Sequence, residues 1–298
     1  MTKLRKLWKA AKVGARVWFG PITLHLRLSR TAHVTSKSWR PAISKLAAPI
    51  ALAALSEGRI SELSPAGVAL IVGTGPGLGS ALARRFARAG MRVAVAARNT
   101  EKLADLALQI ESSGGVCRRY ACDATVERSV VDLIRRICSE MGPPDLVVYN
   151  VEHFTPGTIL DIETPAFEEC WRAMALGGFL VGREAARSMV ARATGTIIYT
   201  GATGARRGRA EYINMAVGKF GVRALAQSMA RDLGPKGIHV AHVILDGGIL
   251  SPRSPADACA RMSSMFPEHI ADVYLDLYRQ HPSVWTQEMD LRPWVERF

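Results

Sequence analysis

The stretch VALIVGTGPGLGSALARRFARAG, residues 68 to 90, contains an apolar run, a glycine-rich turn and a helical pattern in immediate succession. The apolar run is short and rich in β-branched residues, which is typical of a buried strand. The segment after the turn repeats its apolar residues at helical spacing. We therefore expect a strand, a tight turn and a helix, which is the unit from which parallel α/β sheets are built.

The alternation of strand and helix patterns continues along the chain. MRVAVAA, residues 91 to 97, and VCRRYAC, residues 116 to 122, predict two more strands with an amphipathic stretch between them. Parallel strands joined by helical crossovers place helices on both faces of the sheet. The predicted fold class is therefore α/β, a doubly wound parallel sheet of the Rossmann type. We expect it to form a single domain over residues 66 to 298, preceded by a basic N-terminal extension over residues 1 to 65.

The glycine-rich turn has the spacing G-x-x-x-G-x-G, with Leu78 where the commoner G-x-G-x-x-G pattern has its third glycine. Glycines allow the backbone to approach a pyrophosphate at a helix N-terminus, where free N–H groups and the helix dipole favour anions. Between a buried strand and an amphipathic helix, such a turn predicts a dinucleotide site. The residues of the turn expected to contribute are Gly73, Thr74, Gly77, Leu78 and Gly79.

The end of the second strand bears on the choice of cofactor. It reads Ala96-Ala97-Arg98-Asn99, without an acid to accept hydrogen bonds from a ribose. Arg98 could instead pair with a 2′-phosphate, which favours NADP(H) over NAD(H), or it could be an ordinary solvated residue. Asp123, after the third strand, could hold the adenine amino group, cap the following helix, or do both.

Charge is concentrated at the N-terminus. The chain of 298 residues has a formal net charge of +13, but residues 1 to 56 contain eleven Lys or Arg and no Asp or Glu. The remaining 28 basic and 26 acidic residues almost balance. We therefore do not expect the globular part to bind nucleic acid.

The N-terminal stretch KLRKLWKAAKVGARVWF, residues 3 to 19, has the pattern of a basic amphipathic helix. Its apolar stripe consists of Leu4, Trp8, Ala11, Ala15 and Trp18. It resembles a mitochondrial targeting segment, which makes a mitochondrial location the expectation and a cytoplasmic one the alternative. Other interpretations are a retained helix, with residues 1 to 20 contacting an anionic membrane surface or a partner, and a segment without a role.

Five cysteines, an odd number, show neither a C-x-x-C pair nor the spacing of a metal site. We expect reduced thiols in the core and no bound metal. No apolar run reaches the roughly 18 to 20 residues needed to span a bilayer.

Residues 66 to 298 resemble the short-chain dehydrogenase/reductase superfamily. Besides the glycine turn and Asp123, the resemblance includes DLVVYN ending at Asn150 and the helix GGFLVGREAARSMV. Its most specific part is VGKFGVRALAQSMARDLGPKGIHVAHV, residues 217 to 243. The resemblance implies an oxidoreductase with a nicotinamide cofactor, contacted also by Asn150, Lys219 and Gly247.

The chain departs from this family at the catalytic positions. The family's reduction uses a tyrosine to protonate the carbonyl, a lysine to lower the pKa of that tyrosine, a serine and an asparagine. Lys219 matches the lysine, but Met215, Ala202 and Met174 occupy the other three positions, and none of the six tyrosines has a lysine four residues later. The sequence leaves open an oxidoreductase of atypical mechanism or a non-catalytic cofactor-binding subunit, for example of a mitochondrial complex.

Four residues are candidates for the chemistry. Lys219 is the first, although it is expected mainly to bind the cofactor ribose. Thr203 could replace the missing serine hydroxyl. Tyr212 lies two helical turns before Lys219 and could donate a proton or simply form a wall. Glu152 follows the fourth strand, where ligands bind in open α/β sheets, but it could also be a solvated rim residue.

The substrate cannot be identified from the sequence. The segment from Leu250 to Pro267 is expected to form a lid, and its apolar residues favour a small, partly hydrophobic substrate. The helical segments 164 to 190 and 210 to 233 resemble those that pair across subunits in this family, and their faces are rich in Ala and Gly. They suit a homodimer or homotetramer, or a place in a larger complex, but they could also merely pack on the sheet.

Overall fold

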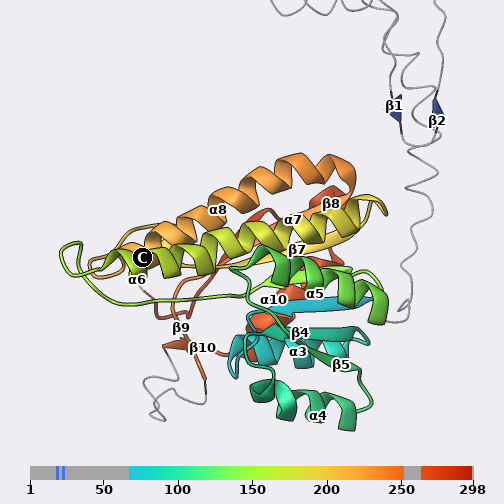
Figure 1. The fold of residues 1–298 in the computed structure, drawn as a ribbon, viewed down its shortest axis with the longest axis horizontal. Coiled ribbons are helices and arrows are strands. Elements are labelled where there is room, and N and C mark those ends of the chain that lie inside the picture. Colours follow the sequence, from blue (N-terminus) through green and yellow to red (C-terminus); the bar gives the residue numbers. More distant parts are fainter. Residues whose placement is uncertain (1–17, 20–21, 24–66, 252–262, 297–298) are drawn as a thin grey trace, which may run out of the picture. The chain divides into compact units, whose positions relative to one another are not determined.

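A computed structural model of the protein describes residues 18–19, 22–23, 67–251 and 263–296 (Figure 1). The chain divides into two units, Met1–Glu62 and Leu63–Phe298. Of the first unit, only β1 (Trp18–Phe19) and β2 (Ile22–Thr23) are described, and they pair antiparallel. The other residues of the predicted targeting segment lie outside the described residues.

The predicted N-terminal helix is wrong at its carboxyl end. Trp18 and Phe19 are strand residues, and Phe19 pairs with Ile22. Aromatic residues favour strands, and Gly20 and Pro21, which follow in the sequence, disfavour helix. The apolar helical stripe therefore cannot include Trp18.

The second unit is built on a seven-stranded sheet in which every pair of neighbours is parallel, in the order β11-β8-β7-β6-β3-β4-β5. The strands are β3 (Val68–Val72), β4 (Arg92–Ala97), β5 (Cys117–Ala121), β6 (Leu146–Tyr149), β7 (Gly195–Ala202), β8 (Ile238–Leu245) and β11 (Glu288–Leu291). The strand order reverses between β3 and β6, which makes this pair the topological switch point. The predicted doubly wound parallel sheet is confirmed.

Helices cover both faces of the sheet, as Figure 1 shows. They are α3 (Leu78–Arg88), α4 (Ala104–Ser112), α5 (Glu127–Glu140), α6 (Thr164–Trp171), α7 (Gly177–Val190), α8 (Ile213–Leu233) and α10 (Pro267–Arg279). Alternate residues of β3 enter two different core clusters, one shared with α5, α7 and α8 and the other with α3, α4 and α10. Because successive side chains of a strand point to opposite faces, a sheet buried on both sides requires the continuous apolar runs seen in the sequence.

The region of the predicted lid is described only at its two ends. There, β9 (Gly248–Ile249) pairs in parallel with β10 (Ser264–Met265). Residues 252–262, which make up most of the predicted lid, lie outside the described residues. In the described part of the chain, no helix has the length and apolarity needed to cross a membrane. Cys117, Cys122, Cys138 and Cys170 are free, and Cys259 falls in the undescribed segment.

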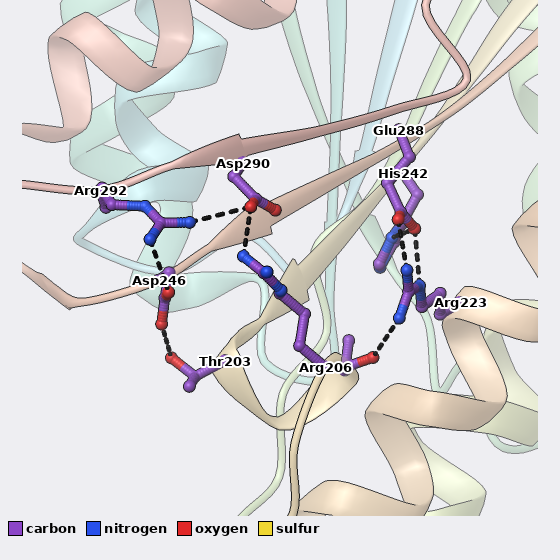
Figure 2. Close-up of polar contacts among 9 residues, drawn as sticks. Thr203, Arg206, Arg223, His242, Asp246, Glu288, Asp290 and Arg292 are labelled. Carbon is purple, nitrogen blue, oxygen red and sulfur yellow. Dashed lines mark hydrogen bonds and ion pairs between the residues drawn. The ribbon is translucent and has the colours of Figure 1, made fainter. Parts of the chain in front are cut away.

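Strand β11 is attached to the rest of the domain by ion pairs on one face (Figure 2). Arg223 of α8 donates to both carboxylate oxygens of Glu288, at 2.6 and 2.8 Å. His242 lies opposite Glu288 in the register of β8 and β11, and its Nδ1 is 3.0 Å from the same carboxylate. One carboxylate thus binds a helix and the neighbouring strand together.

Further ion pairs lie on the same face, toward the carboxyl end of β11. Asp290 pairs with Arg206 and, at 2.8 Å, with Arg292 (Figure 2). Arg292 also pairs with Asp246 at 3.6 Å, and Asp246 accepts a hydrogen bond of 2.6 Å from the hydroxyl of Thr203. A continuous polar chain therefore connects β11 to the loop after β7.

Two buried histidines predict how stability depends on pH. Burial lowers the pKa of both His239 and His242, since it disfavours the imidazolium, and the hydrogen bond to Glu288 only partly opposes this for His242. In the unfolded chain both rings take up a proton near pH 6.5, whereas in the folded protein they do so only at lower pH. Unfolding therefore takes up protons in this window, and stability falls as the pH drops below about 6.5.

We expect the free energy of unfolding to fall by up to about 1.4 kcal/mol per pH unit for each histidine. Urea unfolding of the wild type and of His239→Gln/His242→Gln between pH 5 and 8 measures this, and the variant should show the shallower dependence. His281→Gln, which changes an exposed histidine, is the control. Equal slopes for the wild type and the double variant would contradict the assignment.

Candidate cofactor and active site

An open cavity of about 1070 Å³ lies at the carboxyl ends of the strands, around the switch point between β3 and β6. Ligands bind at this place in open α/β sheets. The structure brings every predicted site residue to its lining: Gly73, Thr74, Gly77, Leu78, Gly79, Arg98, Asp123, Asn150, Glu152, Thr203, Tyr212, Lys219 and Gly247. Their individual roles remain predictions.

The glycine turn is shaped as a phosphate cradle requires. Gly73 has a φ of +89°, and a Cβ on it would lie 2.8 Å from the backbone of Asn150. A Cβ on Gly79 would lie 2.8 Å from the Cα of Thr74, so the turn packs tightly on the start of α3. Gly75, which the predicted pattern left out, also lines the cavity, and a Cβ there would meet no atom within 4 Å. The first turn of α3 contains no acidic residue, which suits an anion.

Hydrogen bonds hold this turn in place. The Thr74 hydroxyl donates to the carbonyl of Ile71 at 3.0 Å. The side-chain amide of Asn150 donates to the carbonyl of Gly73 at 3.1 Å. Asn150 therefore fixes the turn from the neighbouring strand. The residues fit the pyrophosphate of a dinucleotide, since the backbone N–H groups at the start of α3 have no side-chain cap.

Arg98 and Asp123 line the cavity just after the carboxyl ends of β4 and β5. Arg98 is exposed just after β4 and forms no ion pair with a described residue. Asp123 accepts two hydrogen bonds from Thr125, at 2.9 Å from its N–H and 2.8 Å from its hydroxyl. The proposed helix cap is wrong, because the N-cap of α5 is Val126. Asp123 is too far before the helix and caps a local turn instead.

Lys219 is fully buried and donates a hydrogen bond of 3.1 Å to the carbonyl oxygen of Thr200. Burial lowers the pKa of Lys219, and the negative charge of Glu152 opposes this in part. Met215 lies one helical turn before Lys219 and lines the same cavity. The ammonium group therefore stands beside a thioether, which exchanges no proton.

Thr203 begins a short 3₁₀ segment, Thr203–Ala205, directly after β7. Its hydroxyl donates to Asp246, which is almost fully buried, so that proton is already engaged (Figure 2). In this arrangement Thr203 can offer a ligand only the lone pairs of its oxygen.

Tyr212 forms part of the cavity wall. It is the N-cap residue of α8. Its ring stacks on the ring of Phe154, with centroids 4.6 Å apart. The guanidinium of Arg209 lies 5.2 Å from the centroid of the Tyr212 ring. These contacts favour the interpretation of Tyr212 as a wall residue.

Met174 does not line the cavity and is fully buried. It lies in a π-helical turn, Arg172–Leu176, between α6 and α7. The hydroxyl of Tyr149 donates to the carbonyl of Ala173 in this turn. Such a π turn disturbs the regular backbone bonding and is frequent at functional sites, and Arg172 and Ala173 of this turn line the cavity.

Several lining residues were missed by the sequence analysis. They are Arg172, Arg207, Arg209, His153 and Glu169. The only available signal was the run of arginines in ARRGRAE, which follows a predicted strand at the end where ligands bind.

A glycine turn at the switch point of a doubly wound sheet defines the class of dinucleotide-binding α/β proteins. Within that class, residues 67–254 match the family model described as short chain dehydrogenase. The chain belongs to the short-chain dehydrogenase/reductase family, which confirms the resemblance seen in the sequence.

Individual relatives agree with this assignment. The chain is 31% identical over 214 residues to sorbitol-6-phosphate 2-dehydrogenase of Escherichia coli K12, covering 70% of this chain and 83% of the relative. It is 36% identical to a short-chain dehydrogenase of Rhodopseudomonas palustris of known crystal structure, with a TM-score of 0.68, over 76% of this chain and 99% of that chain. A metagenomic short-chain oxidoreductase in complex with NADP shares the fold at 23% identity and a TM-score of 0.67, over 78% of this chain and 99% of that chain.

Proposed function

We propose that this protein is an NADP(H)-dependent oxidoreductase whose proton donor is not the tyrosine of the Tyr/Lys pair. The observation that carries the proposal is that Lys219 is buried beside the cavity that holds the glycine turn, with Met215 one helical turn before it. A lysine buried without a carboxylate in hydrogen-bond contact costs stability, and buried groups with perturbed pKa values cluster at functional sites.

The cofactor would be held by residues already placed around the cavity. The pyrophosphate would lie on the N-terminus of α3 and the turn at Gly73, and Lys219 would donate to a ribose hydroxyl. When bound, a nicotinamide cofactor supplies or accepts a hydride. Glycines and the buried ammonium group thus bind and orient it, and the apolar Met215 excludes water from the reacting centre.

The proton would come from Lys219. Its lowered pKa makes the ammonium group a better acid near neutral pH than an ordinary lysine. Glu152 lies close enough to act electrostatically on Lys219 and lines the same cavity. We infer that the Nζ proton passes to the carbonyl oxygen, directly or through one water, and that Glu152 returns a proton from solvent.

The second candidate is a cofactor-binding protein without turnover. The observation in its favour is that Ala202, Met174 and Met215 are all nonpolar at the positions that resemble the family's serine, asparagine and tyrosine. It predicts NADPH binding with no oxidation by any carbonyl compound.

Titration of the full chain with NADPH and NADH, followed by tryptophan fluorescence, tests the first step. Micromolar binding of NADPH is the expected result, and absence of binding at millimolar concentration would overturn both candidates. A screen of NADPH oxidation with aldehydes and ketones then separates them, because only the oxidoreductase consumes the cofactor.

Replacement of Arg98 tests the choice of cofactor. Arg98→Ala should weaken NADPH binding by about 10- to 100-fold, because a charge-assisted contact with a 2′-phosphate is lost, and leave NADH binding unchanged. Dissociation constants for both cofactors measure this. Arg88→Ala, which removes an exposed arginine outside the cavity, is the control. Equal losses for NADPH and NADH would place Arg98 away from the 2′-phosphate.

We also propose that the chain forms a homodimer or homotetramer through α7 and α8. Phe179 and Phe220, on these two helices, are exposed. Light scattering after size exclusion, for the wild type and for Phe179→Asp/Phe220→Asp, tests this, and a monomeric wild type would contradict it.

For the N-terminal segment we propose mitochondrial targeting, which import of a fusion carrying residues 1 to 65 into isolated mitochondria would test.

A further inference from the structure

Three arginines line the cavity that Met215 and Lys219 also line. Arg207 and Arg209 lie in the loop between β7 and α8, and Arg172 is the first residue of the π-helical turn. All three line the same cavity as Lys219 and are exposed to solvent. Three arginines from two different segments therefore line the cavity that contains the proposed reacting centre.

None of these three arginines forms an ion pair with a described residue, although the domain pairs most of its arginines. Arg206, the neighbour of Arg207, is turned toward β11 and pairs with Asp290 (Figure 2). Arg223 likewise holds Glu288 through two hydrogen bonds. Arg172, Arg207 and Arg209 thus lack an ion-pair partner among the described residues, while Arg206, in the same loop as Arg207, has one.

The position of Arg209 is fixed by aromatic contacts. Its guanidinium lies 5.2 Å from the centroid of the Tyr212 ring, which stacks on Phe154 at 4.6 Å. A cation over an aromatic face is held without losing its ability to donate hydrogen bonds in the plane of the guanidinium. Arg209 therefore keeps donors available for an anion, and the stacked rings supply an apolar wall beside it.

The acidic residues that line the cavity do not pair with these three arginines. Asp123 accepts hydrogen bonds within its own turn, and Glu169 lies 3.3 Å from the imidazole of His153. Glu296 would lie 3.6 Å from a Cβ on Gly247. The charge of Glu152 acts on Lys219. No described carboxylate forms an ion pair with any of the three arginines, so their natural complement is an anion from solution.

We propose that Arg172, Arg207 and Arg209 form a subsite for an anionic group of the substrate. This inference rests on the oxidoreductase function proposed above and gives its substrate class: a carbonyl compound that also carries a carboxylate or a phosphate. Arg207 and Arg209 bind the anion, and the stack of Tyr212 on Phe154 contacts the apolar part of the same molecule. Fork-shaped guanidinium groups suit both anions, so the chemistry common to the two sources is a group with at least two acceptor oxygens.

Binding of matched probes to the full chain, saturated with NADP⁺, tests the subsite without requiring turnover. The carboxylate pair is 4-oxopentanoate and 2-pentanone, and the phosphate pair is dihydroxyacetone phosphate and dihydroxyacetone. Calorimetry should show that at least one anion binds about tenfold or more tightly than its neutral partner. The pair with the larger ratio distinguishes a carboxylate from a phosphate substrate.

Two double variants complete the test. Arg207→Ala/Arg209→Ala should abolish the preference for the anion and change the dissociation constant of NADPH by less than about twofold. Arg88→Ala/Arg231→Ala removes the same charge from exposed positions outside the cavity and should keep the preference.

Three results would overturn the subsite. The first is equal binding of the anions and their neutral partners, and the second is an equal loss of the preference for the anion in both double variants. The third is a large loss of NADPH affinity in Arg207→Ala/Arg209→Ala, which would show that these arginines bind the cofactor. If the wild type fails to bind NADPH, it is the proposed function that fails, so the two failures are distinguishable.

Discussion

Met215→Tyr combined with Ala202→Ser is expected to raise the rate of carbonyl reduction by about 10²- to 10⁴-fold, the usual contribution of a positioned general acid. Met215 lines the cavity one helical turn before Lys219, so a phenol there would stand next to a buried ammonium group. An adjacent cation stabilises the phenolate and lowers the pKa of a tyrosine from about 10 toward neutrality. The serine would supply the second hydroxyl.

The measurement is kcat/KM for NADPH oxidation by the best carbonyl compound found in a screen. A rate that depends on a new ionisation between about pH 7 and 9 would identify the introduced phenol. Met215→Phe/Ala202→Ser is the matched control, because phenylalanine has the size of tyrosine but no hydroxyl. If the two double variants have equal rates, or if both remain inactive while binding NADPH, the cavity does not perform this chemistry.

Lys219→Met should make the protein more stable and weaken its binding of the cofactor. Removing a buried cation abolishes its desolvation cost, and the lost hydrogen bond to Thr200 returns only part of that gain, so we expect about 1–3 kcal/mol of added stability. The same change should weaken NADPH binding by about 10- to 100-fold, because a charged donor to the ribose is gone.

The dependence of this gain on pH gives a sharper test. Burial puts the pKa of Lys219 in the folded protein below its pKa in the unfolded chain. At pH values between these two pKa values, the unfolded chain therefore binds more protons than the folded protein. The wild type therefore recovers stability as the pH rises toward 10, and the advantage of Lys219→Met should shrink in urea unfolding at high pH. Lys236→Met, which removes an exposed lysine paired with Asp232, is the control. A destabilised Lys219→Met, or an advantage that does not change with pH, would contradict the argument.

The fold could be predicted because its signals are local. Each of the runs VALIV, RVAVAA and LVVY is a buried strand, and the glycine turn lies where strand meets helix. Periodicity and turn residues act over a few positions, so they can be read from the chain alone.

The parts that could not be predicted depend on residues far apart in the sequence. Thr203 and Asp246 are 43 residues apart, so the hydrogen bond from the Thr203 hydroxyl to Asp246 could not be predicted from the sequence. The π turn at Arg172–Leu176 is stabilised by Tyr149, more than twenty residues earlier. Arg206 and Arg207 are adjacent and chemically identical, yet one pairs with Asp290 and the other lines the cavity. Tertiary contacts, not local propensity, decide these cases.

The polar chain from β11 to Thr203 has a consequence for the order in which the protein matures on the ribosome. A nascent chain that has emerged as far as Lys219 already contains the glycine turn, the first five strands of the sheet in sequence and the buried lysine. It lacks Asp246, which binds the Thr203 hydroxyl, and Arg292, which pairs with Asp246 (Figure 2). It also lacks Asp290, the partner of Arg206, and Glu288, the partner of Arg223. Because synthesis proceeds from the N-terminus, the loop beside the reacting centre acquires its final partners only after the last described strand has been made. Chains released early would therefore contain the residues of the glycine turn but lack the residues that pair with the loop beside the reacting centre.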